Sequence, residues 1–183
     1  MRIEQTTIKD LLVITPQVFE DQRGYFLETY NSRDFREKGL YYNFVQDNQS
    51  VSVKNVIRGL HFQKKVPQSK LVRVIAGSIW DVAVDLRQNS PTYGKWFGVE
   101  LTEDNFKQLL VPKGFAHGFS VLSDVAVVSY KCDELYMPSS EAGITPHDKT
   151  FKIDWRVSGK PVISQKDSEL PEFLDIEKEL NFT

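Results

Sequence analysis

The stretch Trp80-Asp81-Val82-Ala83-Val84-Asp85-Leu86-Arg87 carries the clearest period-two pattern in the chain. Large apolar residues occupy its even positions, and Asp81, Ala83, Asp85 and Arg87 occupy its odd positions. Successive side chains of a β-strand point to opposite faces, so this alternation predicts a strand. The neighbouring sequence decides whether this strand belongs to an all-β protein or alternates with helices.

The neighbouring sequence favours an all-β protein, because short strand-like runs follow one another with turn residues between them. Residues 70–75 reach the quoted stretch through Ala76-Gly77-Ser78-Ile79, whose glycine suits a hairpin turn. Helical signals are few: residues 33–38 form a predicted helix capped by Ser32, and residues 169–179 a predicted terminal one. The polar run at 46–50 favours a surface loop, with a hydrogen-bonding site as the alternative. The pattern predicts a β-sandwich or barrel with a few short helices.

Composition limits the classes of protein. The chain has 183 residues, 40% of them hydrophobic and 26% charged, which is typical of one globular domain, expected to span residues 1–183. A net charge of -2 gives no reason to expect nucleic acid or a membrane surface as partner. Cys132 is the only cysteine, and no signal-like or membrane-spanning apolar run is present, so we expect a cytoplasmic protein.

The stretch Asn55-Val56-Ile57-Arg58-Gly59-Leu60-His61-Phe62-Gln63 is interpreted as the floor of a binding site. Strand alternation places Arg58 with Leu60 and Phe62 on one face, and Ile57, Gly59, His61 and Gln63 on the other. The glycine would let another group approach the backbone closely. A hydrogen-bonded core histidine is the alternative interpretation of His61.

The residue types favour acid–base chemistry over three other mechanisms. A metal site has weak support, because the position two residues after His61 is Gln63 and no two histidines are paired in spacing. Nucleophilic hydrolysis has little support, because the sequence contains no Gly-x-Ser-x-Gly motif. Phosphate binding by a loop also has little support, because no glycine-rich phosphate loop is present. A histidine base, a tyrosine acid and a lysine that stabilises an enolate remain, with His61, Tyr130 and Lys70 as candidates.

Several ordered motifs resemble those of one enzyme family over residues from about 10 to 167. They are Phe19-x-Asp21-x-Arg23-Gly24-x-Phe26-x-Glu28, Gln46-x-Asn48, Ile57–Gln63, Lys70–Val74, Asp81–Arg87, Ser90-Pro91-Thr92, Val111-Pro112-x-Gly114-Phe115-Ala116-His117-Gly118-Phe119 and Tyr130-Lys131-Cys132. Together they resemble the dTDP-4-dehydrorhamnose 3,5-epimerases.

The resemblance implies a cupin-type jelly-roll barrel that forms a homodimer and uses neither metal nor organic cofactor. It implies inversion of C3 and C5 of dTDP-4-dehydro-6-deoxy-D-glucose, on the way to dTDP-L-rhamnose. His61 falls on the family's catalytic base, Tyr130 on its acid, Asp167 on the partner of the base and Lys70 on the lysine near the substrate carbonyl. Tyr136 falls on the residue that stacks on the thymine. The other positions that fall on substrate contacts are Arg23, Glu28, Gln46, Asp47, Asn48, Arg58, His117, Glu141 and Lys166.

The sequence departs from the family pattern in one region. Thr145-Pro146-His147-Asp148-Lys149 and the segment 155–161 differ from the usual forms, which leaves the base or sugar tolerated open. A related 3-epimerase that inverts one centre is the nearest alternative. A jelly roll that binds a nucleotide-sugar without chemistry and a metal-dependent cupin enzyme are the others.

Overall fold

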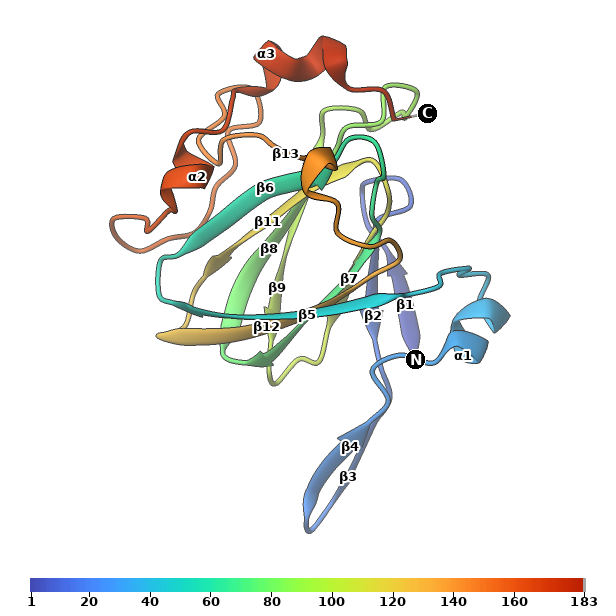
Figure 1. Cartoon of the computed structure of the whole chain (residues 1–183). Helices are drawn as coiled ribbons and strands as arrows, with labels where there is room; N and C mark the ends of the chain where they lie inside the picture. The colour runs from blue at the N-terminus through green and yellow to red at the C-terminus, as the bar shows by residue number, and fades with distance from the viewer. Residues whose placement is uncertain (183) are drawn as a thin grey trace.

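Two antiparallel sheets face each other in the computed structural model, which describes residues 1–182 (Figure 1). One sheet has the strand order β1-β2-β10-β7-β12-β5, and the other has the order β13-β6-β11-β8-β9. The strands are β1 (Arg2–Gln5), β2 (Leu12–Thr15), β3 (Val18–Asp21), β4 (Gly24–Leu27), β5 (Gln46–Val53), β6 (Ile57–Gln63), β7 (Lys70–Ala76), β8 (Ser78–Asp85), β9 (Trp96–Thr102), β10 (Gln108–Val111), β11 (Phe115–Val121), β12 (Val125–Cys132) and β13 (Glu141–Gly143). From β5 to β12 the chain crosses between the sheets at almost every step, which is the jelly-roll arrangement. The all-β prediction is confirmed.

The helices are short and lie outside the sheets (Figure 1). They are α1 (Ser32–Glu37), α2 (Gln165–Ser168) and α3 (Phe173–Ile176), with 3-10 turns at Pro138–Ser140 and Glu177–Glu179. Within residues 1–182, no helix has the length and apolar character needed to cross a membrane. The predicted terminal helix at 169–179 is thus only partly correct, since the chain there forms α3 and a 3-10 turn.

The five-stranded sheet is buried on both faces, which explains the composition of β8. Its inner face contributes Ile79 and Ala83 to the core between the sheets. Its outer face contributes Val82 and Val84 to a second core beneath the C-terminal segment. The alternation in β8 therefore separates two interiors rather than core from solvent, and even Asp81 is fully buried.

Two local predictions are wrong. The polar run Gln46-Asp47-Asn48-Gln49-Ser50 forms the first part of edge strand β5, which pairs with β12, instead of a surface loop. An edge strand of alternating exposure tolerates polar residues, because its outer side chains need no apolar cover. Helix α1 starts one residue earlier than predicted, with the side chain of Asn31 rather than Ser32 accepting the N-terminal N–H groups.

A β-bulge in β6 corrects the predicted faces of the Asn55–Gln63 stretch. Arg58 pairs with Phe119 and His61 with His117, so β6 contains one more residue than β11 between these pairs. Ile57 consequently shares the outer core with Leu60 instead of facing the His61 side. The bulge contains Gly59, at φ +121°, where an added Cβ would lie 2.6 Å from the Cα of Gly118. The predicted close approach at this glycine is therefore made by the neighbouring strand.

Candidate functional site

A cavity of about 240 Å³ lies where the two sheets meet. Four strand ends meet there, because β5 and β7 begin and β6 and β12 finish at its wall. The residues that line it are Gln46, Asn48, His61, Phe62, Gln63, Gln68, Lys70, Tyr130, Cys132, Tyr136 and Glu141. Seven of the fourteen residues predicted for the site are in this group.

The predicted base and the predicted acid stand on different sheets. His61 belongs to β6 of the five-stranded sheet, whereas Tyr130 belongs to β12 of the six-stranded sheet. Lys70 lies on β7 beside Tyr130, with its ammonium 5.9 Å from the centre of the tyrosine ring. A ligand between the sheets would therefore have a base and an acid on different walls and a cation beside the acid.

His61 is held by Asp167, which stands in helix α2. The Nε2 atom of His61 lies 2.7 Å from Oδ1 of Asp167, and the backbone N–H of Gly59 donates to Oδ2 of the same carboxylate. Burial alone would raise the pKa of Asp167, but the hydrogen bond and charge of His61 and the Gly59 N–H outweigh it, so its pKa is lowered. A carboxylate that stays ionised keeps the proton of His61 on Nε2 and leaves Nδ1 free to accept another.

Burial sets the protonation of the other groups. It raises the pKa of Tyr130, against the smaller opposing effect of the Arg58 charge, so the phenol keeps its proton. It lowers the pKa of Lys70, and the charges of the carboxylates Asp81 and Glu141 oppose this shift. It also raises the pKa of Cys132 to about 11, although the nearby Lys70 opposes this, so the thiol is protonated and a poor nucleophile.

Three predicted binding residues form a hydrogen-bonded group at the rim. The hydroxyl of Tyr136 donates to Glu141 at 2.7 Å, and the ammonium of Lys166 donates to the other carboxylate oxygen at 2.6 Å. The bond from Lys166, together with the smaller contribution of Tyr136, lowers the pKa of Glu141 against the effect of its burial. Tyr136 is half exposed, so its ring is available to a ligand.

The remaining predicted binding residues lie around the cavity or away from it. Arg58 bridges to β5 by donating to the hydroxyl of Ser52, and Asp47 faces outward in an ion pair with Lys131. His117 is buried and bonded to Asp81 at 2.7 Å.

Arg23 and Glu28 do not reach the cavity. Arg23 stands at the turn of the β3–β4 hairpin, where it pairs with Asp21, and Glu28 follows β4. Within the described residues 1–182 the hairpin strands pair only with each other, and the hairpin projects away from the jelly roll (Figure 1).

Sequence reasoning missed several residues of the site. Gln63, Gln68 and Cys132 line the cavity, and Asp81 is the partner of His117. The spacing from His61 to Gln63 was a usable signal, because alternate residues of a strand share a face. Nothing in the local sequence marks Gln68 or Asp81 as part of the site.

The segment with unusual sequence does not line the cavity. Asp148 instead accepts from the backbone N–H groups of Thr150, Phe151 and Phe173, which fastens the loop to α3. The indole of Trp155 donates to the carbonyl of Pro146. The departures in residues 145–161 therefore serve the packing of the C-terminal segment.

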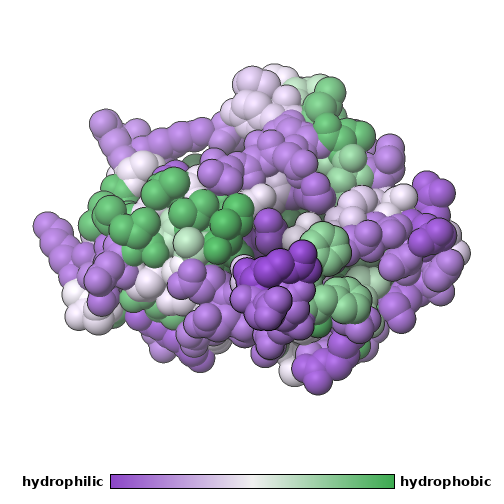
Figure 2. All heavy atoms as spheres, turned by 90° about the horizontal axis from the view of Figure 1, so that it is seen from below, coloured by the Kyte–Doolittle hydropathy of each residue, from purple (hydrophilic) through white to green (hydrophobic). Residues whose placement is uncertain are grey.

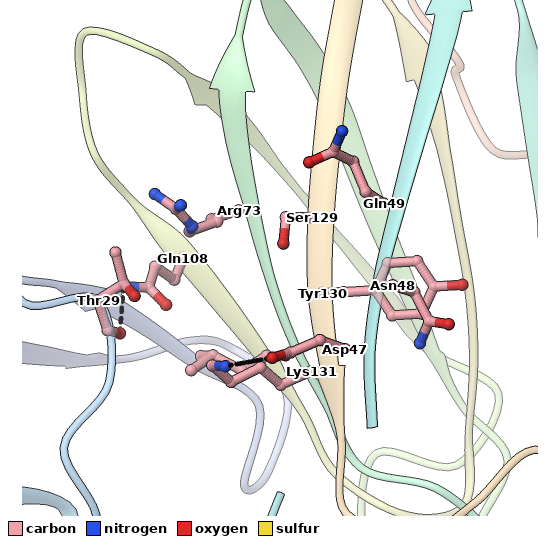
Figure 3. A pocket seen from close by; sticks show the side chains of 10 residues that line it. Thr29, Asp47, Asn48, Gln49, Arg73, Gln108, Ser129, Tyr130 and Lys131 are labelled. Carbon is pink, nitrogen blue, oxygen red and sulfur yellow. Dashed lines mark hydrogen bonds and ion pairs between the residues drawn. The ribbon is translucent and has the colours of Figure 1, made fainter. Parts of the chain in front are cut away.

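A second hollow, of about 320 Å³, lies on the outer side of the six-stranded sheet (Figure 3). Arg73, Ser129 and Lys131 line it, on the side of the sheet opposite to the inward-facing Val72 and Val128. The dashed line in Figure 3 that joins Lys131 to Asp47 marks their ion pair. This hollow contains no acid–base pair like that of the first cavity.

The fold and the first cavity define a class of protein: a jelly roll whose cavity brings together a histidine–aspartate pair and a tyrosine, an arrangement suited to acid–base chemistry. Comparison with known proteins agrees, since the family model described as dTDP-4-dehydrorhamnose 3,5-epimerase matches residues 5–175. The chain belongs to this family and is an isomerase.

Three relatives show how far the similarity extends. The dTDP-4-dehydrorhamnose 3,5-epimerase of Methanothermobacter thermautotrophicus is 52% identical, over 91% of each chain. A crystal structure of a Legionella pneumophila 3,5-epimerase, in complex with dTDP-4-keto-L-rhamnose, has a TM-score of 0.95 and 43% identity and covers 100% of this chain and 98% of its own. A dTDP-4-dehydrorhamnose 3-epimerase of Streptomyces niveus is 39% identical, over 92% of this chain and 82% of its own.

Proposed function

We propose that the chain inverts C3 and C5 of dTDP-4-dehydro-6-deoxy-D-glucose and releases dTDP-4-dehydro-L-rhamnose, in dTDP-L-rhamnose biosynthesis. The observation that carries the proposal is the placement of His61 and Tyr130 on different sheets around one cavity, with Lys70 beside the tyrosine. The relatives named above support the nucleotide-sugar as substrate.

The chemistry starts from the 4-keto group, which acidifies the protons on C3 and C5. Nδ1 of His61 removes one of these protons, and the electron pair moves into the C4 carbonyl to give an enolate. The cation of Lys70 stabilises the enolate oxygen. Tyr130 then delivers its proton to the same carbon from the other face, so the centre is inverted.

Asp167 stabilises the imidazolium that forms when His61 accepts the proton. Tyr130 suits the acid role because its raised pKa keeps the phenol protonated until negative charge develops on carbon. Solvent exchange can restore His61, whose side chain is 33% exposed, and Tyr130, which lines the same open cavity. The remaining predicted contacts, among them Gln46, Asn48 and Arg58, would hold the nucleotide diphosphate.

Incubation with the substrate in D₂O tests this function. NMR and mass spectrometry should find deuterium at both C3 and C5 and a product of L-lyxo configuration. Deuterium at C3 alone would instead favour the 3-epimerase activity of the Streptomyces niveus relative. Activity that persists in EDTA would agree with the prediction that no metal is needed, whereas its loss would contradict it.

We also propose that the protein is a cytoplasmic homodimer. Four apolar side chains on the outer side of β5, β7 and β12 are well exposed: Val51, Val53, Ile75 and Val125. Figure 2 shows hydrophobic side chains gathered on this lower face of the molecule. Such a surface is typical of a protein interface.

The β3–β4 hairpin supports the dimer independently. Phe19, Tyr25 and Phe26 are 54%, 58% and 69% exposed, and an isolated two-stranded hairpin is only marginally stable in water. A second copy would cover these rings, and the hairpin would then bring Arg23 and Glu28 to the cavity of that copy. This arrangement reconciles their predicted role with their position.

Mixing two inactive variants tests the exchange of hairpins. His61→Asn retains an intact hairpin, and Arg23→Ala retains an intact cavity. If equal amounts of the two variants form random dimers, about half of the dimers are mixed, and one of the two sites in each mixed dimer is complete. About a quarter of all sites should then be complete, so activity should return. Two variants that stay inactive together, in a protein that sediments as a dimer, would show that each subunit uses its own hairpin.

A further inference from the structure

Both polar atoms of the Gln63 carboxamide form hydrogen bonds within the protein. The residue is 4% exposed, and its side-chain amide nitrogen donates to the carbonyl of Val66 at 2.7 Å and to that of Leu135 at 3.4 Å. Its carbonyl oxygen accepts from the backbone N–H of Met137 at 2.7 Å. Gln63 stands at the position considered for a second metal ligand, yet its polar atoms are already bonded to backbone.

Apolar packing contributes little to the position of the segment that Gln63 binds. Leu135, Tyr136 and Met137 are 64%, 50% and 40% exposed, so they gain little from apolar packing. Side-chain amides bind the backbone instead: Gln63 binds Leu135 and Met137, and Gln46 accepts from the N–H of Tyr136 at 2.8 Å. Gln68 donates to the carbonyl just before Leu135, that of Glu134.

Gln63 binds the backbone on both sides of Tyr136. It accepts from the residue after Tyr136 and donates to the residue before it, while the phenol itself is fixed by Glu141. The ring is thus held at the backbone and at its hydroxyl, over the wall of the cavity. Loss of the Gln63 bonds would free the backbone at Leu135 and Met137, so that Tyr136 would be held only by its N–H bond to Gln46 and by its hydroxyl.

We propose that Gln63 is a positioning residue whose buried carboxamide sets the place of the Tyr136 ring and thereby the affinity for the nucleoside part of the substrate. The inference rests on the proposed function, in which Tyr136 stacks on the base. Stacking of a base on an aromatic side chain is worth about tenfold or more in affinity, and it requires the ring to lie at one distance and tilt. The proton-transfer groups do not depend on this segment.

Two variants of Gln63 test the proposal. Gln63→Glu keeps an acceptor for Met137 but loses the donation to Val66 and Leu135, and Gln63→Met loses all three hydrogen bonds without adding charge. We expect KM for the dTDP-sugar and Kd for dTDP, measured by calorimetry, to rise about tenfold, with kcat changed by less than about twofold. The affinity for inorganic pyrophosphate, which lacks the base, should stay unchanged.

Gln88→Glu is the matched control, because Gln88 also donates from a partly buried carboxamide to a backbone carbonyl, that of Leu180. Neither Gln88 nor Leu180 lines the cavity. This variant should lower the Tm without changing the affinity for dTDP. A Gln63 variant that behaves like it, with a lower Tm and unchanged dTDP affinity, would overturn the proposal.

A double-mutant cycle with Tyr136→Ala decides whether Gln63 acts through Tyr136. In the Tyr136→Ala background, Gln63→Met should cause no further loss of dTDP affinity. Additive losses, or equal weakening of dTDP and pyrophosphate, would assign Gln63 a general role in the shape of the cavity. The dTDP titrations do not involve turnover, so failure of deuterium exchange in the wild-type protein would reject the proposed function without deciding the role of Gln63.

Discussion

Residues 1–182 contain two histidine–aspartate pairs of nearly identical geometry and different surroundings. In each, Nε2 of the histidine lies 2.7 Å from a carboxylate oxygen, in His61–Asp167 and in His117–Asp81. The side chain of His61 is 33% exposed, whereas that of His117 is 9% exposed and that of Asp81 is fully buried. The pairing itself therefore does not identify a catalytic base; access to the second ring nitrogen does.

The two pairs also differ in how the fold makes them. His117 and Asp81 stand on the adjacent strands β11 and β8, where the sheet holds both. Asp167 instead reaches His61 from helix α2, across 106 residues of sequence. The pair within the sheet is a fixed part of the core, and the pair joined by α2 places His61, the proposed base, at the wall of a cavity.

The largest effect is expected for His61→Asn. The variant keeps a polar side chain but lacks a base at neutral pH, so turnover and deuterium exchange at C3 and C5 should fall by about 10⁴-fold. Calorimetry should find dTDP affinity within a few-fold of wild type. The exposed His147→Asn is the control and should be fully active. Retained exchange in His61→Asn would disprove the base assignment.

Tyr130→Phe should have the next largest effect, because it removes the acid from the wall on the other sheet. We expect turnover to fall by about 10²-fold or more with nucleotide binding preserved. Tyr41→Phe, at an 80% exposed position, is the control. Turnover equal to wild type would exclude Tyr130 as the acid.

Asp167→Asn should reduce turnover by about 10- to 10²-fold, since an amide no longer fixes the tautomer of His61 or stabilises its cation. The pKa of Asp167 is lowered in the folded state, so its contribution to stability is present above the ordinary value of 3.8 and is lost as pH falls through the lowered value. Thermal unfolding from pH 2 to 6 should show this acid loss in the wild type and a smaller one in Asp167→Asn. Asp175→Asn, exposed on α3, is the control. Identical pH profiles for Asp167→Asn and wild type would contradict the lowered pKa.

The sequence was sufficient for features that depend on strand periodicity. The alternation in 80–87 and the β-branched run of β12 predicted strands, and glycine chemistry predicted the turn at Gly77, which has φ +79°. The residues proposed for chemistry also came from the sequence, because His61, Tyr130 and Lys70 are residue types that suit proton transfer. Their meeting in one cavity became evident only in the fold.

Periodicity failed where one residue changed the register or where a partner was distant. The bulge at Gly59 moved Ile57 and Arg58 to faces that simple alternation excludes. No local pattern connects His117 to Asp81, because both occupy strands that would be apolar on either face. Asp167 was predicted from the family resemblance alone. The role proposed for Gln63 could be inferred only once the structure showed where residues 135–137 lie.

Among the substitutions in the two histidine–aspartate pairs and at Tyr130, the smallest effect on turnover is expected for His117→Asn, the counterpart of the first substitution. The asparagine amide can bond Asp81 only in part, in a place where the second oxygen of Asp81 already has no hydrogen-bond partner among residues 1–182. We expect the Tm to fall by roughly 3–10 °C because a buried carboxylate loses part of its hydrogen bonding. Turnover should stay within about tenfold of wild type, because His117 does not line the cavity and Asp81 keeps its place beside Lys70. A variant as inactive as His61→Asn but of unchanged Tm would mean that the buried pair takes part in the chemistry, and that exposure does not separate the two histidines.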